Sequence, residues 1–179
     1  MMQVLHVPLV RQSQEYSCGA AALTSVLYYW GVYEGREPEL FERLDTDELG
    51  THGEDIVNVA RSFGLTASYE SNMTINRLQE LLMEGCTCIL DIQAWIDRPN
   101  VNWEEQWEDG HYVVLIGINN DIAYFMDPSL AGRYGMIPVK EFESRWHDWT
   151  DEGDDKEYHA GIILKGHIAA DMMKPVLIL

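Results

Sequence analysis

One cysteine lies in a setting that favours thiol chemistry. Cys18 begins the segment Cys-Gly-Ala-Ala-Ala-Leu-Thr-Ser-Val-Leu-Tyr-Tyr-Trp, which we predict to be a buried helix with Ser17 at its N-cap and Gly31 as its stop. A thiol at a helix N-terminus faces unpaired backbone amides and the positive end of the helix dipole. Both favour the thiolate, which is the nucleophilic form. The alternative is that Cys18 is a small core residue, because free cysteines are often buried.

A base for this thiol must come from elsewhere in the chain. The six histidines are His6, His52, His111, His147, His159 and His167. His111 differs from the others because Gly110 precedes it and a nearly continuous apolar strand follows it. Asp127 follows the next apolar run, and in a hairpin the end of the second strand lies beside the start of the first. We therefore expect Asp127 to orient the His111 ring, the alternatives being an exposed histidine and a turn-forming Asp-Pro.

Two glutamines upstream of the cysteine could assist the same reaction. Gln12 and Gln14 both precede the predicted helix, and either side-chain amide could donate to an oxyanion on an attacked carbonyl. The residue types alone do not separate them.

Composition narrows the classes of function. The 179 residues fit one domain, with a core of about residues 4–165 and a C-terminal tail of residues 166–179. The chain has 30 acidic and 12 basic residues and a formal charge of -18, which opposes binding to nucleic acid and anionic membranes. This charge could attract basic peptides or simply favour solubility. Because the sequence lacks a long apolar run and a signal peptide, we expect no membrane span and a cytoplasmic location.

No residue cluster indicates a metal or a cofactor. Cys86 and Cys88 lack a second pair of ligands at zinc-finger spacing, so we expect reduced thiols in the core or at the surface. His52 precedes two acidic residues at a predicted helix start, which is typical of capping. We expect His147 at the surface, at the end of a helix rich in tryptophan. The sequence contains no glycine-rich phosphate loop.

Helices dominate the first part of the predicted fold and strands the second. An extended segment at 4–10 leads to helices at 17–30, 38–44, 54–63 and 75–83, and strands are expected at 66–69, 87–92, 111–118, 122–126, 133–139 and 158–164, with a further short helix at 140–146. This order favours an α+β fold with helices packed on an antiparallel sheet. The loop 93–110 contains three tryptophans and is either a wall of a substrate groove or a lid packed on its own core.

These motifs together resemble the bacteriocin-processing cysteine peptidases. These are papain-like domains that cut leader peptides after a double glycine, often at the front of ABC transporters. The resemblance covers Gln12 to Ala21, Gly110 to Leu115 and Asp127-Pro128, in the family's order, and extends over roughly residues 4–165. Gly53-Glu54-Asp55 also looks like the family's middle region.

The resemblance implies a papain-like fold and a Cys18–His111–Asp127 triad acting on peptides without metal or cofactor. Gln12 matches the family's glutamine, six residues before the cysteine, so the resemblance favours Gln12 over Gln14 as the oxyanion donor. Ser17 stands where transporter-linked members often carry an acidic residue, and we expect a stand-alone relative without a transporter segment. A papain-like acyl transferase and a catalytically silent peptide-binding module remain as alternatives.

Overall fold

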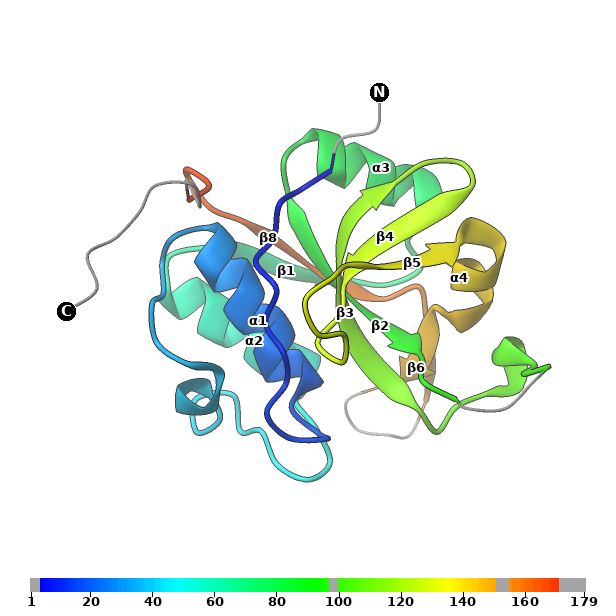
Figure 1. Cartoon of the computed structure of the whole chain (residues 1–179), viewed down its shortest axis with the longest axis horizontal. Coiled ribbons are helices and arrows are strands. Elements are labelled where there is room, and N and C mark those ends of the chain that lie inside the picture. Colours follow the sequence, from blue (N-terminus) through cyan, green and yellow to red (C-terminus); the bar gives the residue numbers. More distant parts are fainter. Residues whose placement is uncertain (1–3, 97–99, 151–154, 171–179) are drawn as a thin grey trace.

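An antiparallel sheet of six strands forms the centre of the molecule (Figure 1). The computed structural model describes residues 4–96, 100–150 and 155–170. The sheet contains β1 (Thr66–Glu70), β2 (Thr87–Gln93), β3 (Gly110–Ile118), β4 (Ile122–Met126), β5 (Gly135–Pro138) and β8 (Gly161–Lys165), in the spatial order β1-β8-β2-β3-β4-β5. A smaller sheet pairs β6 (His147–Trp149) with β7 (Lys156–Tyr158). The prediction of an α+β fold with an antiparallel sheet is confirmed.

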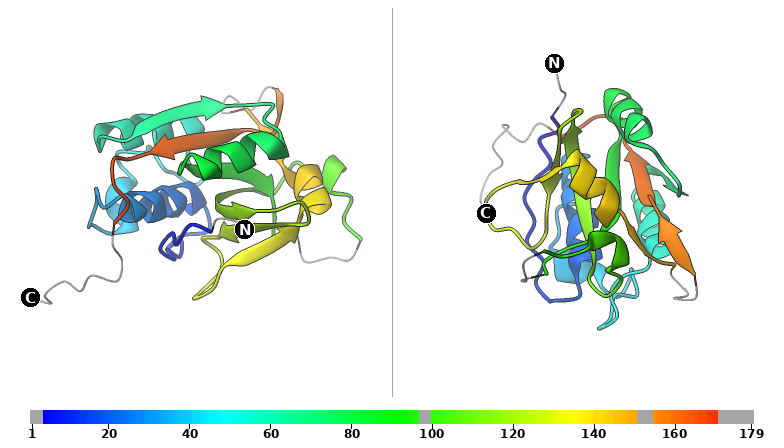
Figure 2. Two further views of the ribbon diagram at one scale, coloured as in Figure 1. Left: turned by 90° about the horizontal axis from the view of Figure 1, so that it is seen from above. Right: turned by 90° about the vertical axis from the view of Figure 1, so that its right-hand side faces the viewer.

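Two helices cover one face of the large sheet. They are α1 (Cys18–Tyr29) and α2 (Gly53–Ser62), and they lie side by side in both views (Figures 1 and 2). Both helices approach the sheet through a glycine in their first turn. A β-carbon on Gly19 would come within 3.0 Å of the Tyr112 ring, and one on Gly53 within 2.8 Å of the Tyr69 ring. These glycines therefore let the starts of both helices lie directly on the sheet.

The opposite face is covered by α3 (Ile75–Met83) and α4 (Val139–Arg145). The hydroxyl of Thr74 accepts a hydrogen bond from the backbone amide of Arg77 at 3.1 Å and so caps the start of α3. Phe142 of α4 packs on Phe125 of β4, with ring centroids 5.4 Å apart, and stacks on the fully buried Trp146. Short 3-10 helices lie at η1 (Glu37–Leu40) and η2 (Trp103–Glu105).

Two predicted elements are confirmed residue for residue. The helix at 75–83 and the strand at 122–126 have the predicted limits. Gly31 has φ +64° and Gly64 has φ +82°, so these glycines end α1 and α2 in the left-handed conformation that glycine tolerates best.

The segment 4–10 is extended, as predicted, and joins no strand ladder, although the Leu5 amide donates to the carbonyl of Ile116 at 2.8 Å. Two other local predictions were wrong. The predicted strand at 158–164 is interrupted, because His159 takes φ +53° and its amide donates to the Trp146 carbonyl. His147 is buried, 4% exposed, since it begins β6 instead of ending a surface helix.

In the part of the chain that the structure describes, no helix is long and apolar enough to cross a membrane. Of the predicted tail, residues 171–179 lie outside the described residues.

Candidate active site

The N-terminus of α1 presents the Cys18 sulfur to backbone donors. Ser17 occupies the N-cap position, but its hydroxyl bonds the backbone of Gln14 in the preceding turn instead of capping the helix. The amides of Gly19 and Tyr112 instead donate to the sulfur. The sequence therefore places a partly exposed thiol at a helix start whose amides remain directed at it.

β3 and β4 bring His111 and Asp127 together. His111 is the second residue of β3, and Asp127 directly follows β4. The His111 Nε2 and Asp127 Oδ1 atoms are 2.8 Å apart, and both residues are buried, 7% and 8% exposed. Asp127 Oδ1 also accepts from the Ser129 amide at 2.8 Å, which holds the carboxylate against the ring.

The His111 imidazole also forms a hydrogen bond with the Cys18 thiol. Cys18, His111 and Asp127 therefore form a continuous row of side chains. Burial alone would raise the pKa of the Cys18 thiol, but the hydrogen bond and charge of His111, together with the two backbone amides, lower it below its ordinary value. Burial would lower the pKa of His111, yet the bonds to Asp127 and Cys18 raise it to about 10. Both shifts favour a thiolate–imidazolium pair near neutral pH.

Gln12 lies in the loop before α1, and its amide is already engaged. Its Nε2 donates to the carbonyls of Gln14 at 2.8 Å and Glu15 at 2.9 Å. Its Oε1 accepts from the Ser129 hydroxyl at 3.1 Å, and Ser129 also donates to Asp127. Gln12 therefore links the loop before the cysteine to the loop that holds the Asp127 carboxylate.

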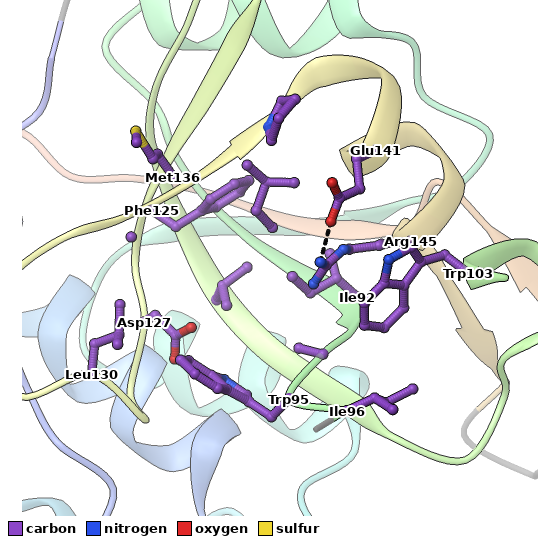
Figure 3. Close-up of a pocket in the computed structure, with 15 residues that line it drawn as sticks. Ile92, Trp95, Ile96, Trp103, Phe125, Asp127, Leu130, Met136, Glu141 and Arg145 are labelled. Carbon is purple, nitrogen blue, oxygen red and sulfur yellow. Dashed lines mark hydrogen bonds and ion pairs between the residues drawn. The ribbon is translucent and has the colours of Figure 1, made fainter. Parts of the chain in front are cut away.

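An apolar cavity of about 280 Å³ lies on the Asp127 side of the row (Figure 3). Trp95 and Asp127 both line this cavity, and Trp103 lies beside Arg145. The Arg145 guanidinium carbon lies 3.6 Å from the centroid of the Trp103 ring, and Arg145 also bonds Glu141. Apolar side chains from the four strands β2 to β5 and from the loops after β2 and β4 add to the lining: Ile92, Ala94, Ile96, Val113, Phe125, Leu130, Met136, Ile137 and Pro138.

A second cavity, of about 340 Å³, lies on the Cys18 side and has a polar lining. Its carboxylates come from Asp47, Asp91, Glu108 and Asp148, and its aromatic rings from Trp107, Tyr112 and Trp149. Trp107 packs on His147 with ring centroids 4.2 Å apart. The loop 93–110 thus lines both cavities, through Trp95 and Trp103 on one side and Trp107 on the other.

The sequence analysis missed two residues close to this row. Asp91 is the only acidic residue in the apolar strand β2, and an aspartate amid Ile89, Leu90 and Ile92 was a detectable signal. Asp148 had no comparable signal, since only the packing of β6 against β2 brings it to the site. No group of three potential metal ligands occurs within residues 4–96, 100–150 and 155–170.

Comparison with protein families and curated proteins identifies the group to which this chain is related. Residues 6–150 match the model of the Peptidase C39 family. This chain belongs to the peptidase C39 family. A protein of Methanothermobacter marburgensis is 31% identical over 123 residues, which are 69% of this chain and 72% of that protein. The transport/processing ATP-binding protein ComA of Streptococcus pneumoniae is 26% identical over 136 residues, which are 75% of this C39 chain but 17% of ComA.

Solved structures of C39 peptidases share the fold. A C39-like peptidase from Bacillus anthracis superposes with a TM-score of 0.69 at 16% identity, covering 93% of this chain and 98% of that one. The peptidase domain of Streptococcus ComA gives 0.62 at 20% identity, covering 90% and 100%. A double glycine motif protease from an AMS/PCAT transporter, in complex with a leader peptide, gives 0.61 at 22% identity, covering 93% and 99%. The papain-like cysteine peptidase fold is therefore confirmed, and this C39 member is a cysteine-type peptidase.

Proposed function

We propose that this C39 peptidase hydrolyses peptide bonds through a thioester on Cys18, with His111 as its base and Asp127 as the residue that orients His111. The continuous row of thiol, imidazole and carboxylate at the start of α1, with 2.8 Å between His111 Nε2 and Asp127 Oδ1, is the observation that carries the proposal. An activated thiolate beside a proton donor is what nucleophilic acyl transfer requires.

The reaction follows from these positions. The Cys18 thiolate forms a bond to the carbonyl carbon, and His111 gives its proton to the amine as the carbon–nitrogen bond breaks. His111 then takes a proton from water, the hydroxide attacks the thioester, and the carbon–sulfur bond breaks. Asp127 keeps the ring in place and stabilises its charged form throughout.

The oxyanion formed during attack needs donors at the start of α1. The Cys18 backbone amide is one, since the first amides of a helix have no partner within the helix. We assign the second donor to the side-chain amide of Gln12. As the substrate binds, one N–H of this amide would exchange its hydrogen bond to a loop carbonyl for one to the oxyanion.

Gln14 provides a matched control for this assignment, because it is exposed and lies two residues from Gln12. Q12A should lower kcat by about 10²-fold while leaving alkylation of Cys18 by iodoacetamide unchanged, because alkylation forms no oxyanion. Q14A should leave both rates near those of the wild type. Equal kcat values for Q12A and Q14A would remove Gln12 from the mechanism.

A peptide fits the two cavities beside the row. The apolar cavity suits an apolar side chain close to the cleaved bond, and the loop 93–110 contributes to both walls. The related protease that binds a leader peptide supports a peptide as the substrate class here.

The deciding experiment is cleavage of a peptide library that includes double-glycine leader sequences, with products read by mass spectrometry. Wild-type protein and C86A should cleave the same peptides, and C18A should cleave none. Addition of a primary amine tests acyl transfer, because a transferase would yield the amide product instead of the free acid. Cleavage by C18A at the wild-type rate, or an amide as the main product, would overturn the proposal.

A further inference from the structure

A pair of carboxyl groups beside Cys18 has no part in the proposed triad. Asp91 of β2 lies opposite Tyr112 of β3 and forms a hydrogen bond with Asp148 of β6. An ionised carboxylate can only accept hydrogen bonds, so one of the two groups must keep its proton for this bond to exist. The pair therefore holds one proton between two carboxyl groups.

Hydrogen-bond donors distinguish the two groups. Asp148 Oδ1 accepts from Gln93 Nε2 at 3.1 Å, and the Trp149 amide also donates to this carboxylate, which favours its ionised form. Burial and then the charge of Asp148 raise the pKa of Asp91 well above its ordinary value. Burial raises the pKa of Asp148 as well, but its donors oppose that shift. The donors to Asp148 therefore favour the proton on Asp91, from where it would be donated to an ionised Asp148.

The pair contacts the strand that carries the proposed base. Asp91 Oδ1 accepts from the backbone amide of His111 at 3.2 Å. Gly110, the residue before the histidine, gives the Asp148 carboxylate room to approach, because a β-carbon at that position would collide with it. The two carboxyl groups thus join β2, β3 and β6 at the start of β3.

Titratable groups from α1, β3 and β6 surround Asp91. The charges of Asp148 and Cys18 raise the pKa of Asp91, and the charge of His111 lowers it. His147, which precedes Asp148 in β6, lowers the pKa of Asp148. The remaining titratable groups of the cavity are Asp47, His52, Glu108 and Tyr112. An ionised Asp91 would therefore add a negative charge to a cavity that already contains the Cys18 thiolate and several carboxylates. That charge would disfavour the thiolate.

We propose that Asp91 is a positioning residue, kept neutral by the proton that it shares with Asp148, which holds the start of β3 in place and spares Cys18 a neighbouring negative charge. This inference rests on the proposed function, because it concerns the reactivity of the same cysteine. A variant with a neutral side chain that preserves the hydrogen bonds of Asp91 should therefore keep its activity. A variant whose side chain cannot form these bonds should lose activity.

Asp91 variants test the proposal by two readouts, kcat/KM for a cleaved peptide and the pH midpoint of Cys18 alkylation by iodoacetamide. D91A should lower kcat/KM about tenfold, because the His111 amide and Asp148 both lose a partner. D91N should restore kcat/KM to within about threefold of the wild type and leave the alkylation midpoint unchanged. D127N, which removes the charged carboxylate on the other side of His111, should raise the midpoint by about one pH unit or more.

A shift of about one pH unit in the alkylation midpoint of D91N would overturn the proposal, because it would mean that Asp91 is charged. Full activity of D91A would also overturn it. If D91A does not fold, D91N decides alone, since its midpoint needs no comparison with D91A. An unreactive Cys18 in the wild-type protein, or peptide cleavage by C18A, would instead refute the proposed function, so the two failures are distinguishable.

Discussion

The start of α1 and the start of β2 each contain a buried or partly buried cysteine, and the two thiols differ in their chemistry. Cys88 is fully buried in β2, and its burial raises the pKa of its thiol. The neighbouring Cys86 raises this pKa further. At Cys18 the same effect of burial is outweighed by His111 and by two backbone amides, so that the pKa falls. Removal from water makes a thiol inert unless donors and a positive charge accompany it.

The three cysteines therefore serve as internal controls for one another. All three are free thiols, and Cys86 and Cys88 are buried while Cys18 is partly exposed. The predictions below test this comparison by changing a cysteine, the group beside it or the pH, and they are ordered by the size of the expected effect.

Removal of the thiol at the start of α1 should have the largest effect. C18A should lower kcat/KM for peptide cleavage by at least about 10³-fold, because the covalent pathway is lost. C88A should retain kcat/KM within about threefold, since Cys88 lies in the core away from the row. Initial rates measured with one peptide at equal concentrations of folded protein check this, and equal losses in C18A and C88A would contradict it.

Replacement of the imidazole should make Cys18 behave like an ordinary thiol. In H111Q the thiol loses the positive charge that offsets the rise in pKa caused by burial. The rate of Cys18 alkylation at pH 6 should therefore fall about 10²-fold. Mass spectrometry of the alkylated peptides measures each cysteine separately, and the rates at Cys86 and Cys88 should not change. Undiminished alkylation of Cys18 in H111Q would show that the helix start alone activates the thiol.

Alkylation and hydrolysis should respond differently to alkaline pH. The thiolate persists above the lowered pKa of Cys18, so alkylation should reach a plateau and remain there. Hydrolysis also requires the imidazolium, whose raised pKa of about 10 means that its proton is present below that pH and is lost above it. The value of kcat/KM should therefore fall about tenfold from pH 9 to pH 11, after correction for unfolding by circular dichroism. Parallel profiles would mean that His111 does not donate the proton.

For stability, Cys88 should matter more than Cys18, which is the reverse of their order for activity. C88S places a hydroxyl among apolar side chains and should lower the free energy of unfolding by about 1–3 kcal/mol. C18S, at a partly exposed helix start, should change it by less than about 1 kcal/mol. Urea denaturation followed by tryptophan fluorescence measures both, and a larger loss in C18S would contradict this interpretation.

The elements that were predicted well are those whose signals are local. The apolar face and limits of α3 follow from the period of its leucines, and the ends of α1 and α2 follow from Gly31 and Gly64. The proximity of His111 to Asp127 was also predictable, because a hairpin of two adjacent strands brings their outer ends together.

The elements that were missed depend on contacts between distant segments. The interruption at His159 follows from its bonds to Trp146 and Met73, and neither bond has a signature near residue 159. The burial of His147 likewise depends on Trp107, which lies forty residues earlier (147 − 107 = 40) and packs on its ring.

The sequence by itself determined the helix with a cysteine at its start, the hairpin with a histidine and an aspartate at its open end, and the family to which these motifs point. Those features are encoded in short stretches, where side-chain periodicity and turn residues act directly on the backbone. Only the tertiary structure decided which donors face the thiol, that Gln12 donates to the carbonyls of its own loop, and that Asp148 and Asp91 line one cavity. Burial and charge act through space, so the pKa of a group depends on neighbours that only folding brings together.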